Sequence, residues 1–531
     1  MSDDICQLVA SLDAIGVRFI GARQESHAVM AATGYAAACG KLGVALIGRG
    51  PALANGVHGA VSASRTGMPV LIISGEAPVM RGATHLMGPD LKAFPAVNVL
   101  RDMGIATFVP ASAESALQTL ADAFAEASLG HTAALLLPMD VQLETVDTPT
   151  LPSPLTLPEG PEPQPARRQS VDTAIATIKN ARRPLIVGGI GVHRGGAREA
   201  VDALAERIGA LCVTTVKAKD LFRGSPWDLG IIGSSSHSLA RRYIEQCDCV
   251  IAIGAALNSL TMSSGTALPP VPLIHIDAVR THIGRWSPAD IAVVGDARLT
   301  AQQLVAGLPD RAAAEKPFHA DEVRERISNF EHTMDFQTQH TAHTLDQRVV
   351  ALELSRMLPE NRHVVFDGGN FMANWAYITV PDPGHFTHTS DSGSVGLGLG
   401  TAVGIKRARP DRTVVLLIGD GGLLMTLGEI ETIIREDLPV VVICMNDAAY
   451  GAEAHILKGQ NMSPAMATFF DVDFAPMVEP LGFDAHTVRT MDDLHQLAPL
   501  LAKPEGPVFI DVKVNVDVIA PFITEFTHKE N

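Results

Sequence analysis

The stretch TVVLLIGDGGLLM (413–425) places Asp420 and three neighbouring glycines directly after a run of apolar residues. A second apolar run, PVVVICM (439–445), ends at Asn446-Asp447. A strand, a crossover helix and a parallel strand connect right-handedly, so the carboxyl ends of both predicted strands lie at one edge of the sheet. We therefore expect Asp420 and Asp447 to converge in the crevice outside the strand ends, where open α/β sheets bind ligands.

The two strand ends together predict a metal–diphosphate site. Gly419, Gly421 and Gly422 let the backbone approach an anion closely. The helix that follows, predicted over 424–436, offers free N–H groups at its N-terminus. Mg²⁺ prefers octahedral oxygen coordination and is commonly held by one or two carboxylates plus phosphate oxygens. A tight turn is the alternative for either motif alone, but the pair on matching strand ends favours the metal site.

Composition limits the class of protein. A chain of 531 residues exceeds what one hydrophobic core serves, and 47% hydrophobic with only 5% aromatic residues favours stacked α/β layers. The net charge of −17 offers no electrostatic footprint for nucleic acid or an anionic membrane. The N-terminus lacks the basic and long apolar parts of a signal peptide, and no apolar run is long enough to span a bilayer, so we expect a cytoplasmic protein. Six cysteines are too sparse for a disulfide framework.

Two polar segments divide the chain into three predicted domains. Residues 150–169 are crowded with proline, and residues 309–343 are polar between two apolar, strand-rich regions. The predicted domains are 1–150, 168–308 and 344–531, each a mostly parallel sheet flanked by helices.

Short apolar runs rich in Val, Ile and Leu give the expected strands. They lie at residues 17–22, 44–50 and 69–75 of the first domain, 183–189, 249–254 and 272–277 of the second, and 363–369, 413–422, 439–447 and 507–514 of the third, with a helix across 28–40 of the first.

Gly-Asp-Gly followed at this distance by Asn-Asn is a thiamine diphosphate signature, and the chain resembles the acetolactate synthase and 2-oxo acid decarboxylase superfamily. Other segments stand in the expected order: GARQESHAVMAATGYA (21–36), GRGPALANGVHGA (48–60), PLIVGGIGV (184–192) and SGSVGLGLGTAVG (392–404). The resemblance implies that Asp420, Asp447 and the carbonyl of Ala449 hold Mg²⁺. It also assigns Asn446, with Gly421 and Gly422, to cofactor binding.

Asp447 stands where the second Asn of the signature would be. This departure keeps an oxygen ligand and adds negative charge, so tighter divalent binding is expected.

Glu25 is the predicted cofactor-activating acid. A lone glutamate in a loop is ordinarily a solvated surface charge, but the resemblance of 21–24 before it and 31–36 after it places it in this role. Thiamine diphosphate reacts as a C2 carbanion, and a carboxyl group that shares a proton with its aminopyrimidine ring promotes the imino tautomer that removes the C2 proton. An apolar setting raises the pKa of a carboxyl group and helps it share that proton near neutrality.

The third domain carries further predicted cofactor contacts. The resemblance makes Val395 a hydrophobic wedge that bends the cofactor and gives the carbonyl of Gly393 to the aminopyrimidine. A strand-to-helix turn with close helix packing is the alternative for this glycine-rich segment. Asn370, in DGGNF, stands where a diphosphate-contacting residue could lie.

Two residues favour decarboxylases. Glu453 stands shortly after Asp447, where 2-oxo acid decarboxylases place an active-site acid, and a surface helix glutamate is the alternative. His85 resembles half of their paired-histidine element, and a loop histidine is the alternative. Arg49 is either a reader of a substrate carboxylate or a surface arginine. The strand and Phe-Gly-x-Pro-Gly turn that family members carry before residue 17 are expected to be missing.

The central domain resembles the acetolactate synthase domain that carries FAD, but two features argue against a functional flavin. No acidic residue closes the strand predicted after the glycine run 188–196, and 255–259 replaces the flavin-contacting arginine motif. Because Glu25 comes from the first domain and the diphosphate site from the third, the resemblance implies sites between two subunits of a homodimer or homotetramer.

The sequence thus predicts a thiamine diphosphate- and Mg²⁺-dependent enzyme. It would cleave or form a carbon–carbon bond next to the carbonyl of a small 2-oxo acid, as an acetolactate synthase-like carboligase or a decarboxylase. The alternatives are a non-catalytic regulatory paralogue of the same fold, a thiamine diphosphate enzyme acting on an acyloin, diketone or acyl-CoA, and a flavin or nicotinamide oxidoreductase.

Overall fold

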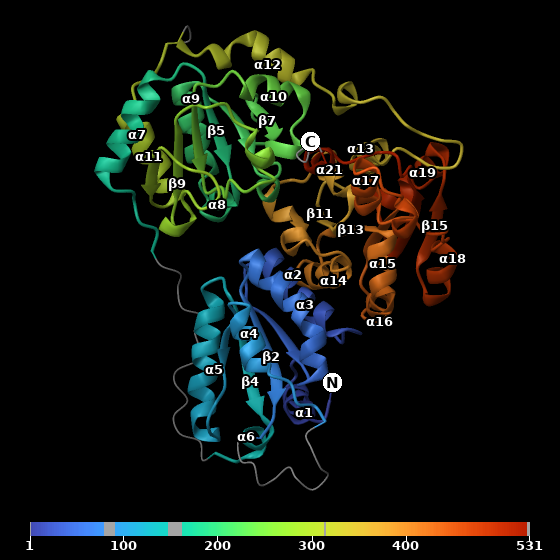
Figure 1. The fold of residues 1–531 in the computed structure, drawn as a ribbon. Coiled ribbons are helices and arrows are strands. Elements are labelled where there is room, and N and C mark those ends of the chain that lie inside the picture. Colours follow the sequence, from blue (N-terminus) through green and yellow to red (C-terminus); the bar gives the residue numbers. More distant parts are fainter. Residues whose placement is uncertain (1, 79–90, 147–161, 313–314, 528–531) are drawn as a thin grey trace.

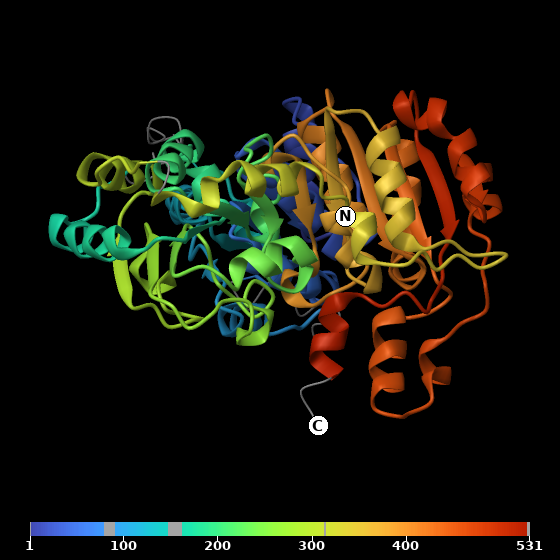
Figure 2. The ribbon, with the colours of Figure 1, turned by 90° about the horizontal axis from the view of Figure 1, so that it is seen from above.

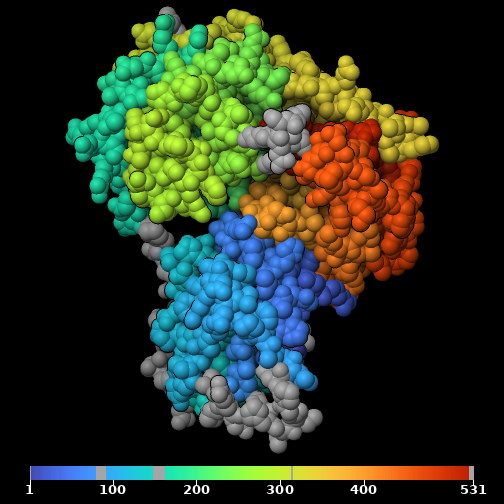
Figure 3. Space-filling model, in the orientation of Figure 1, coloured from blue at the N-terminus to red at the C-terminus, as the bar shows by residue number. Residues whose placement is uncertain are grey.

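The computed structural model describes residues 2–78, 91–146, 162–312 and 315–527 (Figure 1). These residues form three separate parallel sheets, each flanked by helices, which confirms the predicted α/β class. In Figure 1 the first domain lies below the other two, which lie beside each other at the top. The space-filling view shows the first domain as a distinct mass that meets the others over a narrow contact (Figure 3).

The first sheet has four parallel strands in the order β1-β2-β4-β3. Apolar residues of the central strands β2 and β4 are buried on both faces, as a parallel sheet between helices requires. The strands are β1 (Gly43–Ile47), β2 (Val70–Glu76), β3 (Ala106–Phe108) and β4 (Thr132–Pro138), and the helices are α1 (Cys6–Ala14), α2 (Glu25–Cys39), α3 (Pro51–Thr66), α4 (Ala96–Asp102), α5 (Ala113–Ser128) and α6 (Met139–Leu143).

The strand predicted at 17–22 was wrong. These residues form no strand and belong to no sheet; the chain passes from α1 through this segment into α2. Its polar backbone bonds to the third domain instead, since Arg435 donates to the carbonyl of Gly21, and Ile20 packs against that domain's core. The apolar character of this segment thus reflects the packing of Ile20 against the third domain, not a strand of the first sheet.

The central sheet has six parallel strands in the order β10-β9-β8-β5-β6-β7, the order of doubly wound dinucleotide-binding sheets. Its strands are β5 (Pro184–Gly188), β6 (Leu211–Thr214), β7 (Asp228–Ile231), β8 (Cys249–Ile253), β9 (Leu273–Asp277) and β10 (Ile291–Val294). Its helices are α7 (Arg168–Asn180), α8 (Ile190–Arg194), α9 (Arg198–Ile208), α10 (Ser238–Ile244) and α11 (Ala297–Gly307), and α12 (Asp321–Ser328) follows.

The glycine run after β5 packs tightly against the chain that leaves β8. The backbone N–H groups of Gly189 and Gly191 donate to Ile253 and Gly254 at 2.9 and 3.0 Å. A side chain at Gly189 would meet the Gly254 carbonyl oxygen at 2.0 Å. These glycines therefore serve close packing at the switch point, and their N–H groups are not free to bind a phosphate.

The third sheet has six parallel strands in the order β12-β11-β13-β14-β16-β15. Alternate residues of β13 and β14 face two different hydrophobic clusters, so both faces are buried. The strands are β11 (Arg362–Phe366), β12 (Phe386–His388), β13 (Thr413–Gly419), β14 (Val440–Asn446), β15 (Asp484–Val488) and β16 (Val508–Lys513). The helices are α13 (Gln347–Met357), α14 (Gly398–Ala408), α15 (Asp420–Thr426), α16 (Ile430–Arg435), α17 (Gly451–Gly459), α18 (Ala475–Val478), α19 (Met491–Gln496), α20 (Ala498–Ala502) and α21 (Pro521–Thr527).

The crossover predicted as one helix over 424–436 has three parts: the end of α15, a 3₁₀ turn at Leu427–Glu429, and α16. Viewed from above, α17 and α21 project together from one edge of the third domain (Figure 2).

Helix α2 of the first domain packs directly on α14 of the third. Gly34, Gly400 and Gly404 allow this contact, because a side chain at any of them would collide with backbone of the facing helix. At Gly404, for example, an added Cβ would lie 1.9 Å from the carbonyl oxygen of Ala31. The contact places the N-terminus of α2, and with it Glu25, beside the third sheet.

Candidate active site

A cavity of about 540 Å³ opens at the carboxyl ends of the third sheet. It lies between the chain segments that leave β11 and β13, where the strand order reverses. This is the crevice in which open α/β sheets bind ligands. Its volume is within the range of small-molecule and cofactor pockets. The predicted residues Asn370, Gly393, Val395, Asp420, Gly421, Gly422, Asp447, Ala449 and Glu453 all line it.

Asp420 and Asp447 come together in this cavity, as the strand ends predicted. Asp420 is the first residue of α15 and is 4% exposed. Burial raises the pKa of Asp420 to about 6, and burial together with the charge of Asp420 raises the pKa of Asp447 well above its usual value. Two buried carboxyl groups held this close require either a shared proton or a cation.

The turn after β14 is shaped by a second, buried polar group. The side-chain amide of Asn446 donates to Asp511 at 3.0 Å and to the carbonyl of Val472 at 2.9 Å, while its oxygen accepts from Ala448. Ala448 adopts a left-handed conformation with φ 55°. Asn446 is not among the residues that line the cavity, so its observed contacts fix the turn that carries Asp447.

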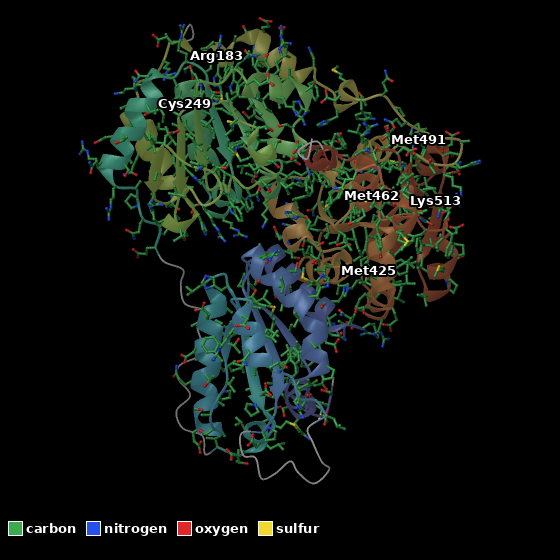
Figure 4. The ribbon with its side chains drawn as sticks, viewed as in Figure 1. Arg183, Cys249, Met425, Met462, Met491 and Lys513 are labelled. Carbon is green, nitrogen blue, oxygen red and sulfur yellow. The ribbon has the colours of Figure 1, made fainter. Side chains whose placement is uncertain are left out.

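Asp511 is itself held by an ion pair with Lys513 at 2.9 Å, and both side chains are buried. The pair anchors the end of β16 beside β14, and Lys513 is labelled within the third domain in Figure 4.

Gly421 and Gly422 begin α15, where first-turn N–H groups lack partners within the helix. A side chain at Gly421 would meet the ring of Tyr450 at 2.4 Å, and one at Gly422 would meet the carboxylate of Asp367 at 2.8 Å. Because these two residues have no side chains, the backbone of the turn lines the cavity while Tyr450 and Asp367 pack close against it.

Asp367 holds the loop that carries Gly393 and Val395. This carboxylate is fully buried and accepts from the Thr389 hydroxyl at 2.6 Å and from the backbone N–H of Gly396 at 2.6 Å. It also accepts from Leu397 at 3.2 Å, at the start of α14.

Sequence reasoning missed Asp367, although it ends a predicted strand in DGG as Asp420 does in GDGG.

Asn370 lines the cavity but uses its side chain on the C-terminal segment. Its amide donates to the carbonyl of Val518 at 2.8 Å, and its oxygen accepts from Ala520 at 2.9 Å. Gln347 donates to the same Val518 carbonyl at 2.9 Å. These amides seat the chain that leads into α21, which adds Phe522 to the cavity wall. The predicted diphosphate contact of Asn370 remains a prediction.

Glu453 lies on the first turn of α17, is exposed, and lines the cavity. The apolar part of the wall comes from Leu260 of the central domain and from residues such as Met372 and Met425. Met425 is labelled in Figure 4, on the side of the third domain that faces the first. Among the described lining residues there is no Lys, Arg or His. A bound diphosphate would therefore need a cation to offset its charge.

Glu25 is the first residue of α2 and is half-buried. Asn55 donates to its carboxylate at 3.2 Å, and the neighbouring His27 accepts from the N–H of Gly400 at the start of α14. Glu25 is not among the residues that line the cavity, but the α2–α14 contact holds it beside the third domain. The predicted strand at 17–22, which would have led to Glu25, is absent from the structure.

The two remaining predicted residues are His85 and Arg49. His85 falls outside the described residues. Arg49 is half-buried in the first domain, where its backbone N–H donates to Asp4 at 2.8 Å and its guanidinium lies 3.8 Å from the same carboxylate. Arg49 does not line the cavity, and it pairs with Asp4 instead of standing free on the surface. A role for it in reading a substrate carboxylate remains a prediction.

The donor set fits a metal–diphosphate group. Two carboxyl groups and the carbonyl of Ala449 offer oxygen ligands, which Mg²⁺ prefers. In the described part of the chain no cluster of three or more His, Cys, Asp or Glu could hold a metal, so further ligands would have to come from phosphate or water. The pKa values of Asp420 and Asp447 are raised because their negative charges are poorly solvated and close together. A bound cation would offset these charges, as bound protons otherwise do.

Three family models match the chain. "Thiamine pyrophosphate enzyme, N-terminal TPP binding domain" matches residues 1–94, the "central domain" model 171–304, and the "C-terminal TPP binding domain" model 367–512. Across the described residues, no helix has both the length and the apolar character needed to cross a membrane.

Several known proteins are similar over most of their length. Acetolactate synthase isozyme 2 large subunit of Escherichia coli is 27% identical over 519 residues, covering 94% of this chain and 89% of that protein. A probable acetolactate synthase large subunit of Methanocaldococcus jannaschii is 27% identical over 514 residues, 94% of this chain and 86% of its own. Sulfoacetaldehyde acetyltransferase of Alcaligenes xylosoxydans xylosoxydans is 28% identical over 474 residues, 82% and 76% respectively.

Proposed function

Because the chain belongs to the thiamine pyrophosphate enzyme family, we propose that it uses thiamine diphosphate and Mg²⁺ to form or cleave the carbon–carbon bond next to the carbonyl of a 2-oxo acid. One observation carries the proposal: Asp420, Asp447, Ala449 and the glycine turn at 421–422 converge on one cavity with Gly393 and Val395. Carboligation stands first, because the similar proteins are named acetolactate synthases and an acetyltransferase.

Each residue has a stated task in this proposal. Asp420, Asp447 and the carbonyl of Ala449 would hold Mg²⁺, and the first turn of α15 would face the diphosphate. Bound there, thiamine diphosphate supplies a stabilised carbanion.

The Gly393 carbonyl and the Val395 side chain would orient the cofactor ring. Glu25 would share a proton with a ring nitrogen, and Glu453 would hold a proton at the substrate carbonyl oxygen.

The association of two or more chains is also part of the proposed function. In the structure α2 and α14 of one chain meet, which holds Glu25 beside the domain that carries the cavity, although Glu25 does not line it. Two chains that exchanged their first domains would make the same contact, which is a low-cost route to a dimer. We therefore retain the homodimer or homotetramer with sites between subunits as a proposal, and sedimentation analysis with the cofactor added tests it.

The reaction is tested by carbon dioxide release from a panel of aliphatic and aromatic 2-oxo acids, with thiamine diphosphate and Mg²⁺ present. Release that depends on both supports the proposal; a hydroxyketone or acetohydroxy acid marks a carboligase, and a free aldehyde marks a decarboxylase. The matched control Glu25→Gln should bind the cofactor but turn over poorly. Absence of release by a protein shown to bind the cofactor would contradict 2-oxo acid chemistry and favour an acyloin, diketone or acyl-CoA. A chain that binds no cofactor would favour the non-catalytic paralogue.

A further inference from the structure

A buried carboxylate of the third domain holds the backbone just before Glu25. Glu429 ends the 3₁₀ turn between α15 and α16 and is 2% exposed. One of its carboxylate oxygens accepts from the backbone N–H of Arg23 at 2.6 Å and from that of Gln24 at 2.7 Å. Its other oxygen accepts from the Thr432 hydroxyl at 2.9 Å. All the observed hydrogen bonds of Glu429 thus serve to hold it in place or to hold the entry to α2.

The two amides that it binds precede Glu25 directly. Gln24 is the N-cap of α2, and its side chain accepts from the N–H of His27. Glu429 therefore fixes the backbone of the cap residue and of the residue before it, which leaves the Cα of Glu25 little freedom. Hydrogen bonds to an ionised acceptor are about twice as strong as neutral ones. The contact spans 405 positions of sequence between Gln24 and Glu429.

The carboxyl end of Glu25 is held separately, by the side-chain amide of Asn55. The body of α2 is held by the glycine contact with α14. Glu429 links the entry of α2 to the crossover that starts at Asp420 through a buried contact, beside the exposed contacts Arg435–Gly21 and Arg23–Glu431. Asp420 begins α15, and Glu429 ends the turn that follows that helix. One short segment thus carries a predicted metal ligand at one end and the anchor of the predicted activating acid at the other.

We propose that Glu429 is a positioning residue for Glu25: it sets the distance between the activating acid and the cofactor ring without touching either. The inference rests on the proposed function, since it gives Glu429 a task only if Glu25 activates thiamine diphosphate. A displacement of about 1 Å at a catalytic group can cost about 100-fold in rate. Loss of this anchor should therefore lower the reaction rate far more than it lowers the free energy of unfolding.

The chain offers a matched control two positions away. Glu431 forms an ion pair with the Arg23 side chain at 2.5 Å and another with Arg435, but both partners are largely exposed. It contacts the same residue as Glu429 through the side chain rather than the backbone. Exposed pairs of this kind contribute little. Glu431→Gln therefore changes the local charge as Glu429→Gln does and leaves the backbone anchor in place.

The first measurement needs no cofactor. Hydrogen–deuterium exchange of the free protein, read on a peptide covering 21–28, reports the amides of Arg23 and Gln24. In Glu429→Ala these two amides should lose protection, whereas Glu431→Gln should exchange like the wild type and peptides of the sheet cores should be unchanged in both. Wild-type exchange at 21–28 in Glu429→Ala would overturn the proposal, because the anchor would then not exist in solution.

The second measurement reads the activation of the cofactor directly, as the exchange of its C2 proton with D₂O at saturating thiamine diphosphate. Glu429→Ala should slow this exchange about 100-fold with little change in cofactor Kd. Glu429→Gln, whose amide oxygen still accepts both N–H groups, should lose less than about tenfold. Equal losses in Glu429→Ala and Glu429→Gln would overturn the proposal, because they would show that keeping an accepting oxygen at residue 429 does not preserve the rate of C2 exchange.

A double-mutant cycle shows whether Glu429 acts through Glu25. The variant Glu25→Gln/Glu429→Ala should exchange no more slowly than Glu25→Gln alone, and losses that multiply would overturn the inference. Slow exchange in Glu25→Gln beside normal exchange in Glu429→Ala would overturn the inference only. Normal exchange in Glu25→Gln would overturn the role of Glu25 in the proposed function, and the inference with it.

Discussion

Replacing Gly34 with alanine tests how closely the first and third domains must approach. Gly34 faces α14, and a Cβ at this position would lie 2.2 Å from the carbonyl oxygen of Thr401. That oxygen is part of a helix backbone and cannot swing aside. Restoring an ordinary contact of 3.4 Å therefore moves the two helices apart by about 1 Å.

The expected cost is small in stability and large in rate. Overpacking costs about 1–3 kcal/mol, and the better helix propensity of alanine returns about 1 kcal/mol, so the net loss is about 0–2 kcal/mol. The shift of α2 carries Glu25 with it, and a displacement of about 1 Å at a catalytic group costs about 100-fold in turnover. Activity should thus fall far more than the midpoint of unfolding.

The assay is turnover of the 2-oxo acid substrate at saturating thiamine diphosphate, beside urea unfolding of the same preparations. Gly506→Ala is the control, because a Cβ there meets nothing within 4 Å. It should leave both quantities unchanged. Wild-type turnover in Gly34→Ala would refute the reasoning, since it would show that the spacing of α2 and α14 does not set the position of Glu25.

The remaining predictions concern four polar residues in or near the cavity: Asp420, Asp447, Asn446 and Asp367. Burial raises the folded pKa of Asp420 to about 6 and that of Asp447 well above its usual value. The metal-free folded state therefore binds more protons than the unfolded state above pH 4, so its stability should fall as pH rises from 4 through 6, measured by urea unfolding. Asp447→Asn should stabilise the metal-free protein and weaken Mg²⁺ binding, and an unchanged affinity in calorimetric titration would contradict the role of the added charge. Asn446→Ala should weaken Mg²⁺ binding about 10–100-fold by freeing the turn that carries Asp447; unaltered binding would show that the turn holds itself. Asp367→Ala should cost about 3 kcal/mol in urea unfolding, because buried donors lose their acceptor, and a loss below about 1 kcal/mol would mean that water replaces it.

The features predicted correctly from sequence are those that local rules determine. Short apolar runs correctly predicted strands in all three sheets, among them β2, β13 and β14, and right-handed crossovers placed Asp420 and Asp447 at one edge. Both aspartates line the same cavity because β13 and β14 are adjacent and parallel.

The features that sequence reasoning missed depend on contacts between domains. The segment 17–22 has the apolar pattern of a strand, but it packs against the third domain instead of joining the first sheet. Glu429 lies in the predicted crossover LMTLGEIETIIRE, where an acidic residue reads as a solvated helix charge, and nothing local announces that it is buried against Gln24. No rule based on sequence spacing predicts contacts between residues that lie this far apart in the chain.

The close contact between α2 and α14 also has a genetic consequence. Under the proposed function, a contact made within one chain would put Glu25 and Asp420 of that chain in one site, so two null alleles, Glu25→Gln and Asp420→Asn, expressed in one cell would not complement. In dimers that exchange first domains, mixed pairs would regenerate sites with both residues intact, and the same alleles would complement. Whether the contact between these two glycine-bearing helices forms within one chain or between two chains therefore determines whether this gene shows intragenic complementation.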